Sequence, residues 1–251
     1  MSKGDFAALL AENGILPFSI VAHPNAAAGL ETHGTTVLAV KYKGGALNLG
    51  DRRATAAAAI MYDKAEKIIA LDDYTLIALA GAYGRAIESA RYLRHAFKYF
   101  SRSQLQPMSL DGKLQEISRA LSANLPNAMS GIGLFVPILT AYDLAESRAR
   151  IYFYDASGAR FESDSYTAAG SGSERIRGAF EYIEKTRGKF EERPYDDVLK
   201  DALTLLDIAS DLDSATGGFD KVLPTAKRVS EEGVVSLSDE ELRAAISKLG
   251  K

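Results

Sequence analysis

A pair of threonines at the start of a predicted strand is the first candidate for chemistry in this 251-residue chain. Gly34-Thr35-Thr36 leads directly into the apolar run 37–40. A threonine hydroxyl is a weak nucleophile at neutral pH and needs a base. Its own α-amino group, with an ordinary pKa of about 7.7 to 8.0, can be that base. The α-amino group of Thr35 is free only if Thr35 is the first residue of the chain. A nucleophilic role for Thr35 therefore predicts a cleavage between Gly34 and Thr35.

Short polar and glycine-rich motifs recur at the ends of other predicted elements. They are Gly50-Asp51-Arg52-Arg53-Ala54-Thr55 after the second strand, Lys67 before the third, Ala80-Gly81 after the fourth, Gly170-Ser171-Gly172-Ser173 before a helix and Asp213-Ser214-Ala215-Thr216-Gly217-Gly218 after another. Each motif alone is consistent with a structural role, such as a salt-bridged loop, a solvated lysine, a tight turn or a helix cap. Their combination is what favours a catalytic site.

The composition excludes several other kinds of site. The chain has no cysteine, which rules out disulfides, a thiolate zinc site and a cysteine nucleophile. His23, His33 and His95 occur in different contexts, which favours structural or solvent-facing roles over a metal site. With only three histidines, the sequence also gives little support for a Ser-His-Asp catalytic triad. We therefore predict chemistry that needs no metal and no cofactor.

The charge and hydropathy patterns bear on partners and location. The net charge is -3 and no basic stripe stands out, so we expect no nucleic-acid partner. No apolar run reaches 18 residues, so we expect no membrane span. The first residues include Asp5 and Glu12 and lack the sustained apolar core of a secretory signal. We expect a cytoplasmic protein.

The elements that must position these motifs come in blocks of strands and helices. Strand pairs are predicted at 36–40 with 46–49, 67–71 with 74–80 and 225–229 with 234–237, and further strands at 133–142, 150–154 and 159–162. Helices are predicted at 85–100, at 111–125 with Pro126 helping to end it, at 173–187, at 196–211 and from Ser238 onward, with a short amphipathic turn or helix near 6–10. Segregated blocks favour an α+β fold. We predict a four-layer αββα sandwich of two antiparallel sheets flanked by helix pairs.

Together and in this order, the quoted motifs resemble those of proteasome β-subunits of the bacterial, actinobacterial type, members of the N-terminal nucleophile hydrolases. The resemblance extends from Gly34 to about Leu237. The HslUV-type peptidase also begins with Thr-Thr, but Arg52-Arg53 favours the proteasome. The resemblance implies that residues 1–34 are a propeptide removed by autocatalytic cleavage and that residues 35–251 form the peptidase domain.

The resemblance also implies a role for individual residues. Thr35 would be the nucleophile and, through its freed amine, the base. An ammonium on Lys67 would favour deprotonated forms of that hydroxyl and amine, and Asp51 would pair with Lys67. The backbone N–H of Gly81 would stabilise the oxyanion. The supporting residues would be Ser171, Asp213 and Thr216 around the amine, and Arg53 in its loop.

By the same resemblance, six residues would line the first substrate pocket. They are Ala54, Ala65, Ile69, Leu79, Tyr83 and Ile87. These side chains are apolar or aromatic, and none is acidic. We therefore predict cleavage after hydrophobic residues.

The resemblance implies a threonine endopeptidase that degrades unfolded or tagged proteins inside a ring-shaped chamber. Seven β-subunits would form each ring, flanked by rings of proteasome α-subunits, and a ring ATPase would feed in the substrate. Two alternatives remain open. One is a non-catalytic β-subunit that only builds the ring, and the other is a small-molecule amidase of the same fold.

Overall fold

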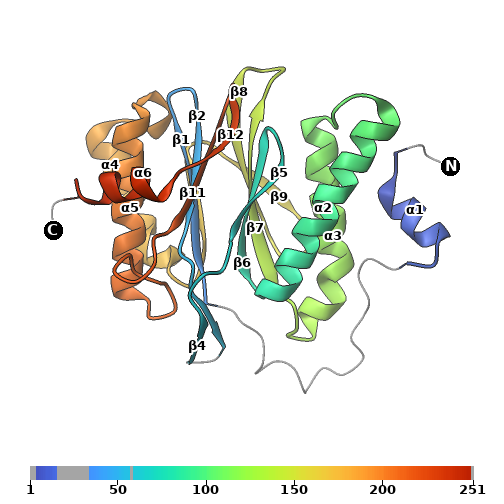
Figure 1. Cartoon of the computed structure of the whole chain (residues 1–251), viewed down its shortest axis with the longest axis horizontal. Helices are drawn as coiled ribbons and strands as arrows, with labels where there is room; N and C mark the ends of the chain where they lie inside the picture. The colour runs from blue at the N-terminus through green and yellow to red at the C-terminus, as the bar shows by residue number, and fades with distance from the viewer. Residues whose placement is uncertain (1–3, 16–33, 57–58, 250–251) are drawn as a thin grey trace.

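Two five-stranded sheets pack face to face between outer layers of helices (Figure 1). The computed structural model describes residues 4–15, 34–56 and 59–249. Within these residues every strand pairing is antiparallel. The predicted αββα sandwich is confirmed.

The first sheet has the strand order β10-β1-β2-β11-β12. Its strands are β1 (Thr36–Tyr42), β2 (Gly45–Gly50), β10 (Tyr166–Gly170), β11 (Thr225–Ser230) and β12 (Gly233–Ser236). The β1–β2 hairpin pairs Val37 with Gly50, and β1 also pairs Thr36 with Gly170. This register places the motifs that follow β2 and β10 beside the start of β1.

The second sheet has the order β5-β6-β7-β8-β9. Its strands are β5 (Ile68–Asp72), β6 (Thr75–Gly81), β7 (Phe135–Asp143), β8 (Arg148–Tyr154) and β9 (Arg160–Ser163). Lys67 directly precedes β5, and its carbonyl accepts a hydrogen bond from the Leu79 N–H of β6 at 2.9 Å. The start of β5 and the end of β6 therefore lie at the same end of this sheet.

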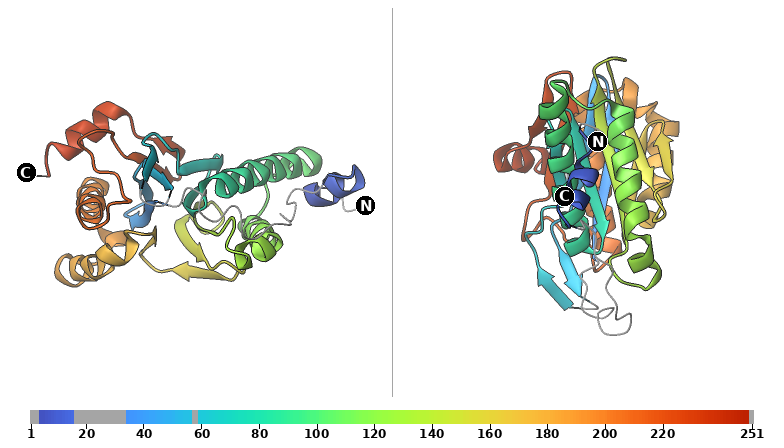
Figure 2. Two further views of the ribbon diagram at one scale, coloured as in Figure 1. Left: turned by 90° about the horizontal axis from the view of Figure 1, so that it is seen from below. Right: turned by 90° about the vertical axis from the view of Figure 1, so that its right-hand side faces the viewer.

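Two helices cover each sheet (Figures 1 and 2). The helices α2 (Tyr83–Gln104) and α3 (Leu110–Met129) lie on the second sheet, and α4 (Ser173–Arg187) and α5 (Tyr195–Leu212) on the first. Shorter elements are α1 (Phe6–Glu12), η1 (Phe190–Glu192) and α6 (Asp239–Ile246). No helix among the described residues is long and apolar enough to cross a membrane.

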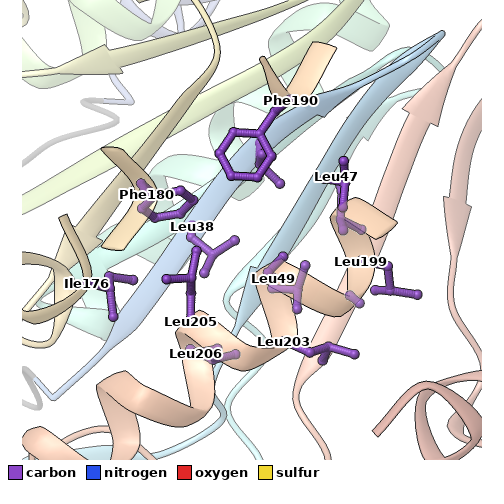
Figure 3. Close-up of a cluster of buried hydrophobic side chains, with 14 of the residues drawn as sticks. Leu38, Leu47, Leu49, Ile176, Phe180, Phe190, Leu199, Leu203, Leu205 and Leu206 are labelled. Carbon is purple, nitrogen blue, oxygen red and sulfur yellow. The ribbon is translucent and has the colours of Figure 1, made fainter. Parts of the chain in front are cut away.

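The core explains why every residue of β1 is buried. Alternate residues of a strand face opposite sides of its sheet. Leu38 packs with Leu47, Leu49 and residues of α4 and α5 in the cluster of Figure 3. Val37, on the other side, packs against the second sheet. Because both faces are buried, β1 is fixed rigidly where it meets Thr35.

One predicted helix end differs from the structure, and three strands were not predicted. Pro126 does not end α3, which continues to Met129. The proline ring removes one helical hydrogen bond, but the Ser130 hydroxyl bonds to the Pro126 carbonyl at 3.0 Å and closes the last turn. The strand β10 and the projecting hairpin of β3 (Ala54–Ala56) and β4 (Ala59–Tyr62) were not predicted, because their alanine-rich sequences lack a strand pattern.

Candidate active site

Thr35 lies directly before β1, and it is only 2% exposed. Its carbonyl accepts a hydrogen bond from the Ser171 N–H at 2.9 Å. The carbonyl of the preceding Gly34 lies 3.3 Å from Lys67 Nζ. A Cβ atom at Gly34 would lie 2.2 Å from Thr55 Oγ1, closer than real contacts allow. Only glycine fits at this position without a shift of the neighbouring side chain.

Asp51 and Lys67 form a buried ion pair beside Gly34. Lys67 Nζ lies 2.7 Å from Asp51 Oδ1, and the two side chains are 1% and 0% exposed. Lys67 also donates to the Arg53 carbonyl. Burial lowers the pKa of the Lys67 amine, while the Asp51 carboxylate opposes this shift. A lowered pKa makes it easier for this amine to exchange a proton with a neighbouring group.

The Asp51 carboxylate is held by backbone donors from three segments. Oδ1 accepts the Thr36 N–H at 2.8 Å, and Oδ2 accepts the N–H groups of Arg53 and Gly217, both at 2.9 Å. With Lys67, the carboxylate therefore has four partners. Such bonds fix the orientation of the carboxylate.

A second polar cluster contacts Thr35 and Thr36 through Ser171 and Thr216. Asp213 Oδ2 accepts the hydroxyls of Ser171 and Thr216, each at 2.6 Å. Since Thr216 gives its proton to Asp213, the 2.6 Å contact between Thr36 and Thr216 assigns Thr36 as donor. Burial raises the pKa of the Asp213 carboxyl, but the bonds from Ser171, Thr216 and the Ala215 N–H, with the nearby charge of Arg175, together outweigh burial, and the pKa is lower than usual.

Arg53 connects the two clusters. Its Nη1 donates to the carbonyls of Ser214 at 3.1 Å and Thr216 at 3.3 Å, and its Nε pairs with Asp63 at 3.2 Å. The loop after β2 and the loop after α5 are therefore tied together around Thr35. This geometry supports a positioning role for Arg53.

Gly81 ends β6 with a φ of 106°, a conformation that favours glycine. Gly81 comes two residues after Leu79, whose N–H donates to the Lys67 carbonyl. Gly81 therefore lies at the same end of the sheets as the Asp51–Lys67 pair.

The six predicted pocket residues lie in two kinds of surroundings. Ala54, Ala65 and Leu79 are buried, while Ile69, Tyr83 and Ile87 are partly exposed. Leu79 belongs to the core beneath α2 and α3, with Ile69 and Ile87 packed against it. The Tyr83 hydroxyl accepts the Glu66 N–H at 3.1 Å, next to Ala65. The lining role of all six residues stays a prediction.

Sequence reasoning missed the contributions of several residues. Thr36 donates its hydroxyl to Thr216 and its N–H to Asp51. The Gly172 N–H bonds to Thr36 Oγ1 at 3.0 Å, and a Cβ at Gly172 would lie 2.5 Å from that oxygen. The available signals were the doubled threonine and the glycines of the two later motifs. His95 lies exposed on α2, whereas His23 and His33 are outside the described residues.

No group of three or more histidine, cysteine, aspartate or glutamate side chains that could hold a metal ion occurs in the described part of the chain. The polar atoms around Thr35 instead pair with one another.

Comparison with known proteins agrees with this fold. A family model described as "Proteasome subunit" matches residues 31–222, which is most of the chain. The chain therefore belongs to the proteasome subunit family, a family of protein-degrading assemblies.

Similar curated proteins are named as β-subunits. A proteasome subunit beta of Acidothermus cellulolyticus is 34% identical over 86% of this chain and 75% of its own length. Proteasome subunit beta 1 of Streptomyces avermitilis is 35% identical over 93% and 81%. Proteasome subunit beta 1 of Rhodococcus erythropolis is 38% identical over 84% and 72%. The predicted resemblance is confirmed, and the function is that of a core β-type subunit assembled with other proteasome subunits.

Proposed function

We propose that this β-type subunit is a threonine endopeptidase that activates itself by cleaving the Gly34–Thr35 bond. The observation that best supports this is the contact of Lys67 Nζ with both Asp51 Oδ1, at 2.7 Å, and the Gly34 carbonyl oxygen, at 3.3 Å. A charged donor therefore lies at the carbonyl that must be attacked.

Self-cleavage begins with attack of Thr35 Oγ on the carbonyl carbon of Gly34. The Lys67 ammonium stabilises the negative charge that develops on the carbonyl oxygen. When the C–N bond breaks, Gly34 is left as an ester on Thr35 Oγ, and the Thr35 nitrogen takes up the hydroxyl proton. This step frees the Thr35 amine. Water then hydrolyses the ester, which frees the Thr35 hydroxyl and leaves Gly34 as the carboxyl end of the released segment.

Peptide hydrolysis repeats this chemistry on a bound substrate. The freed Thr35 amine accepts the hydroxyl proton as Oγ attacks the substrate carbonyl, and the proton passes to the leaving amine. The Gly81 N–H stabilises the oxyanion, a role whose loss in enzymes generally costs roughly 3 to 4 kcal/mol. Hydrolysis of the ester-linked acyl-enzyme regenerates Thr35.

The second polar cluster supports the amine that acts as base. The Asp213 carboxylate orients the Ser171 and Thr216 hydroxyls, each at 2.6 Å. Ser171 also bonds through its N–H to the Thr35 carbonyl at 2.9 Å. These contacts hold Thr35 so that its nitrogen stays beside the polar cluster after cleavage.

The setting of this activity is proposed from the family. We place the subunit in seven-membered β-rings flanked by α-rings, in the cytoplasm, with a ring ATPase that delivers unfolded or tagged proteins. The hydrophobic and aromatic pocket residues support cleavage after hydrophobic residues.

The variant Thr35→Ala tests the proposal directly. Co-expressed with its α-partner, it should assemble, keep residues 1–34 and hydrolyse no peptide, whereas the wild type should be processed and active. Processing or peptide hydrolysis in the Thr35→Ala particle at the wild-type level would refute the proposal.

A further inference from the structure

The N-terminal helix α1 packs against the outer helical layer formed by α2 and α3 (Figures 1 and 2). The Phe6 ring lies 5.6 Å from the ring of Tyr92 and 5.7 Å from that of Tyr99. Phe6 is partly buried against the core cluster of α2 and α3. The helix is thus anchored by one aromatic side chain between two others.

Polar contacts hold the start of the same helix. Asp5 Oδ1 accepts the Ala8 N–H at 3.0 Å and lies 3.7 Å from Arg119 on α3. Arg119 also pairs with Glu116 at 3.0 Å. Burial raises the pKa of Tyr92 to about 12, so the ring that Phe6 contacts is neutral. We call the surface around Tyr92, Tyr99 and Arg119 the α1 seat.

The direction of the helix on its seat follows from three contacts. Gly4 lies against Phe100 and Gln104, whereas Phe6 reaches back to Tyr92. The helix α1 therefore runs antiparallel to α2. Its next turn, at Leu10, lies toward the Tyr92 end of the seat.

Packing on the α1 seat stabilises the helical conformation of α1. The helix has seven residues and none is fully buried. Isolated helices shorter than about 12 to 15 residues are marginal in water, so α1 depends on packing. The contact is also small, and a free segment must offset a large loss of translational and rotational freedom to bind. A covalent tether removes most of that loss by supplying a high effective concentration.

We propose that residues 4–15 are a tethered cover for the α1 seat, which cleavage before Thr35 releases. The inference rests on the proposed self-cleavage for the release step alone. Its consequence is that processing alters two places at once: it frees the Thr35 amine, and it bares Tyr92, Tyr99 and Arg119 on the α2–α3 face.

Cross-linking in an uncleavable chain tests the cover. The chain has no cysteine, so introduced pairs react alone. In the full-length Thr35→Ala chain, Leu10→Cys is combined with His95→Cys, an exposed position on the same face of α2 as Tyr92 and Tyr99. The matched control combines Leu10→Cys with Glu181→Cys on α4. A short bis-maleimide should link the first pair within one chain at least about tenfold faster than the control.

Phe6→Ala added to the first pair should reduce the linking rate toward the control. A peptide of residues 4–15 with the same cysteine, added to processed His95→Cys particles, should link no faster than to processed Glu181→Cys particles. Equal rates for the two intrachain pairs, or links that join two chains, would overturn the tethered cover. If the first pair links preferentially in the Thr35→Ala chain but the wild type never cleaves, the packing of α1 on its seat is supported. The release step and the proposed function are then overturned. Cleavage without preferential linking would overturn the cover alone.

Discussion

Lys67 Nζ and Asp51 Oδ1 lie 2.7 Å apart in a place where neither side chain reaches solvent. The same ammonium lies 3.3 Å from the Gly34 carbonyl oxygen, and the same carboxylate bonds to the Thr36 N–H. The pair therefore fixes the chain on both sides of Thr35. Both folding and catalysis depend on these two residues. An experiment on either residue must therefore measure the free energy of unfolding as well as the extent of self-cleavage.

Asp51→Asn should impair both stability and processing. Removing one partner of a buried ion pair leaves an uncompensated charge and typically costs about 3 to 5 kcal/mol. Asp111→Asn is a matched control, because Asp111 pairs with Arg160 at 3.3 Å at an exposed site, and it should cost less than about 1 kcal/mol. Denaturant unfolding gives the free energies, and intact mass gives the processed fraction. Equal effects of the two variants would contradict the account of the pair.

Gly34→Ala should slow self-cleavage by at least about tenfold, equivalent to about 1.4 kcal/mol in the barrier. The added Cβ would lie 2.2 Å from Thr55 Oγ1 and would displace the Gly34 carbonyl from Lys67. Thr55→Ala removes this obstacle, so the double variant should recover part of the rate while Thr55→Ala alone processes normally. A time course of intact mass measures all three. Normal processing of Gly34→Ala would show that the close approach is unimportant.

Asp213 gives the site a predictable response to acid. The pKa of its carboxyl is below the ordinary 3.8 in the folded chain. Its stabilisation is therefore complete above pH 3.8 and is lost as the pH falls through the lower folded value. Asp213→Asn should be less stable than wild type near neutral pH, and the difference should shrink in strong acid. Thermal unfolding at several pH values checks this, and a constant difference between the proteins would argue against it.

Cleavage preference tests the six predicted pocket residues. Because none of them is acidic, peptides with a hydrophobic residue before the cleaved bond should give a kcat/KM at least about tenfold higher than peptides with Lys or Arg. Fluorogenic peptides that differ only at that residue provide the measurement. Equal or faster cleavage after basic residues would mean that other side chains line the pocket.

The fold was largely predictable because its strands are apolar and its main helices are periodic. The site was predictable in outline because its motifs lie at the ends of those elements. Hidden from the sequence were contacts between distant segments, such as Gly217 with Asp51 and Gly172 with Thr36. No local pattern indicates which backbone N–H groups meet a carboxylate or hydroxyl from another part of the chain. The packing of Phe6 on Tyr92 and Tyr99 was hidden for the same reason.

Activity in the proposed mechanism requires that Thr35 become a free N-terminal nucleophile. The most direct test is the intact mass of this subunit, co-expressed with its α-partner, before and after treatment with a threonine-directed covalent inhibitor. We predict a chain that begins at Thr35 and gains one inhibitor adduct. A chain that still begins at Met1 in assembled particles and stays unmodified would contradict the claim and favour a subunit that only builds the ring.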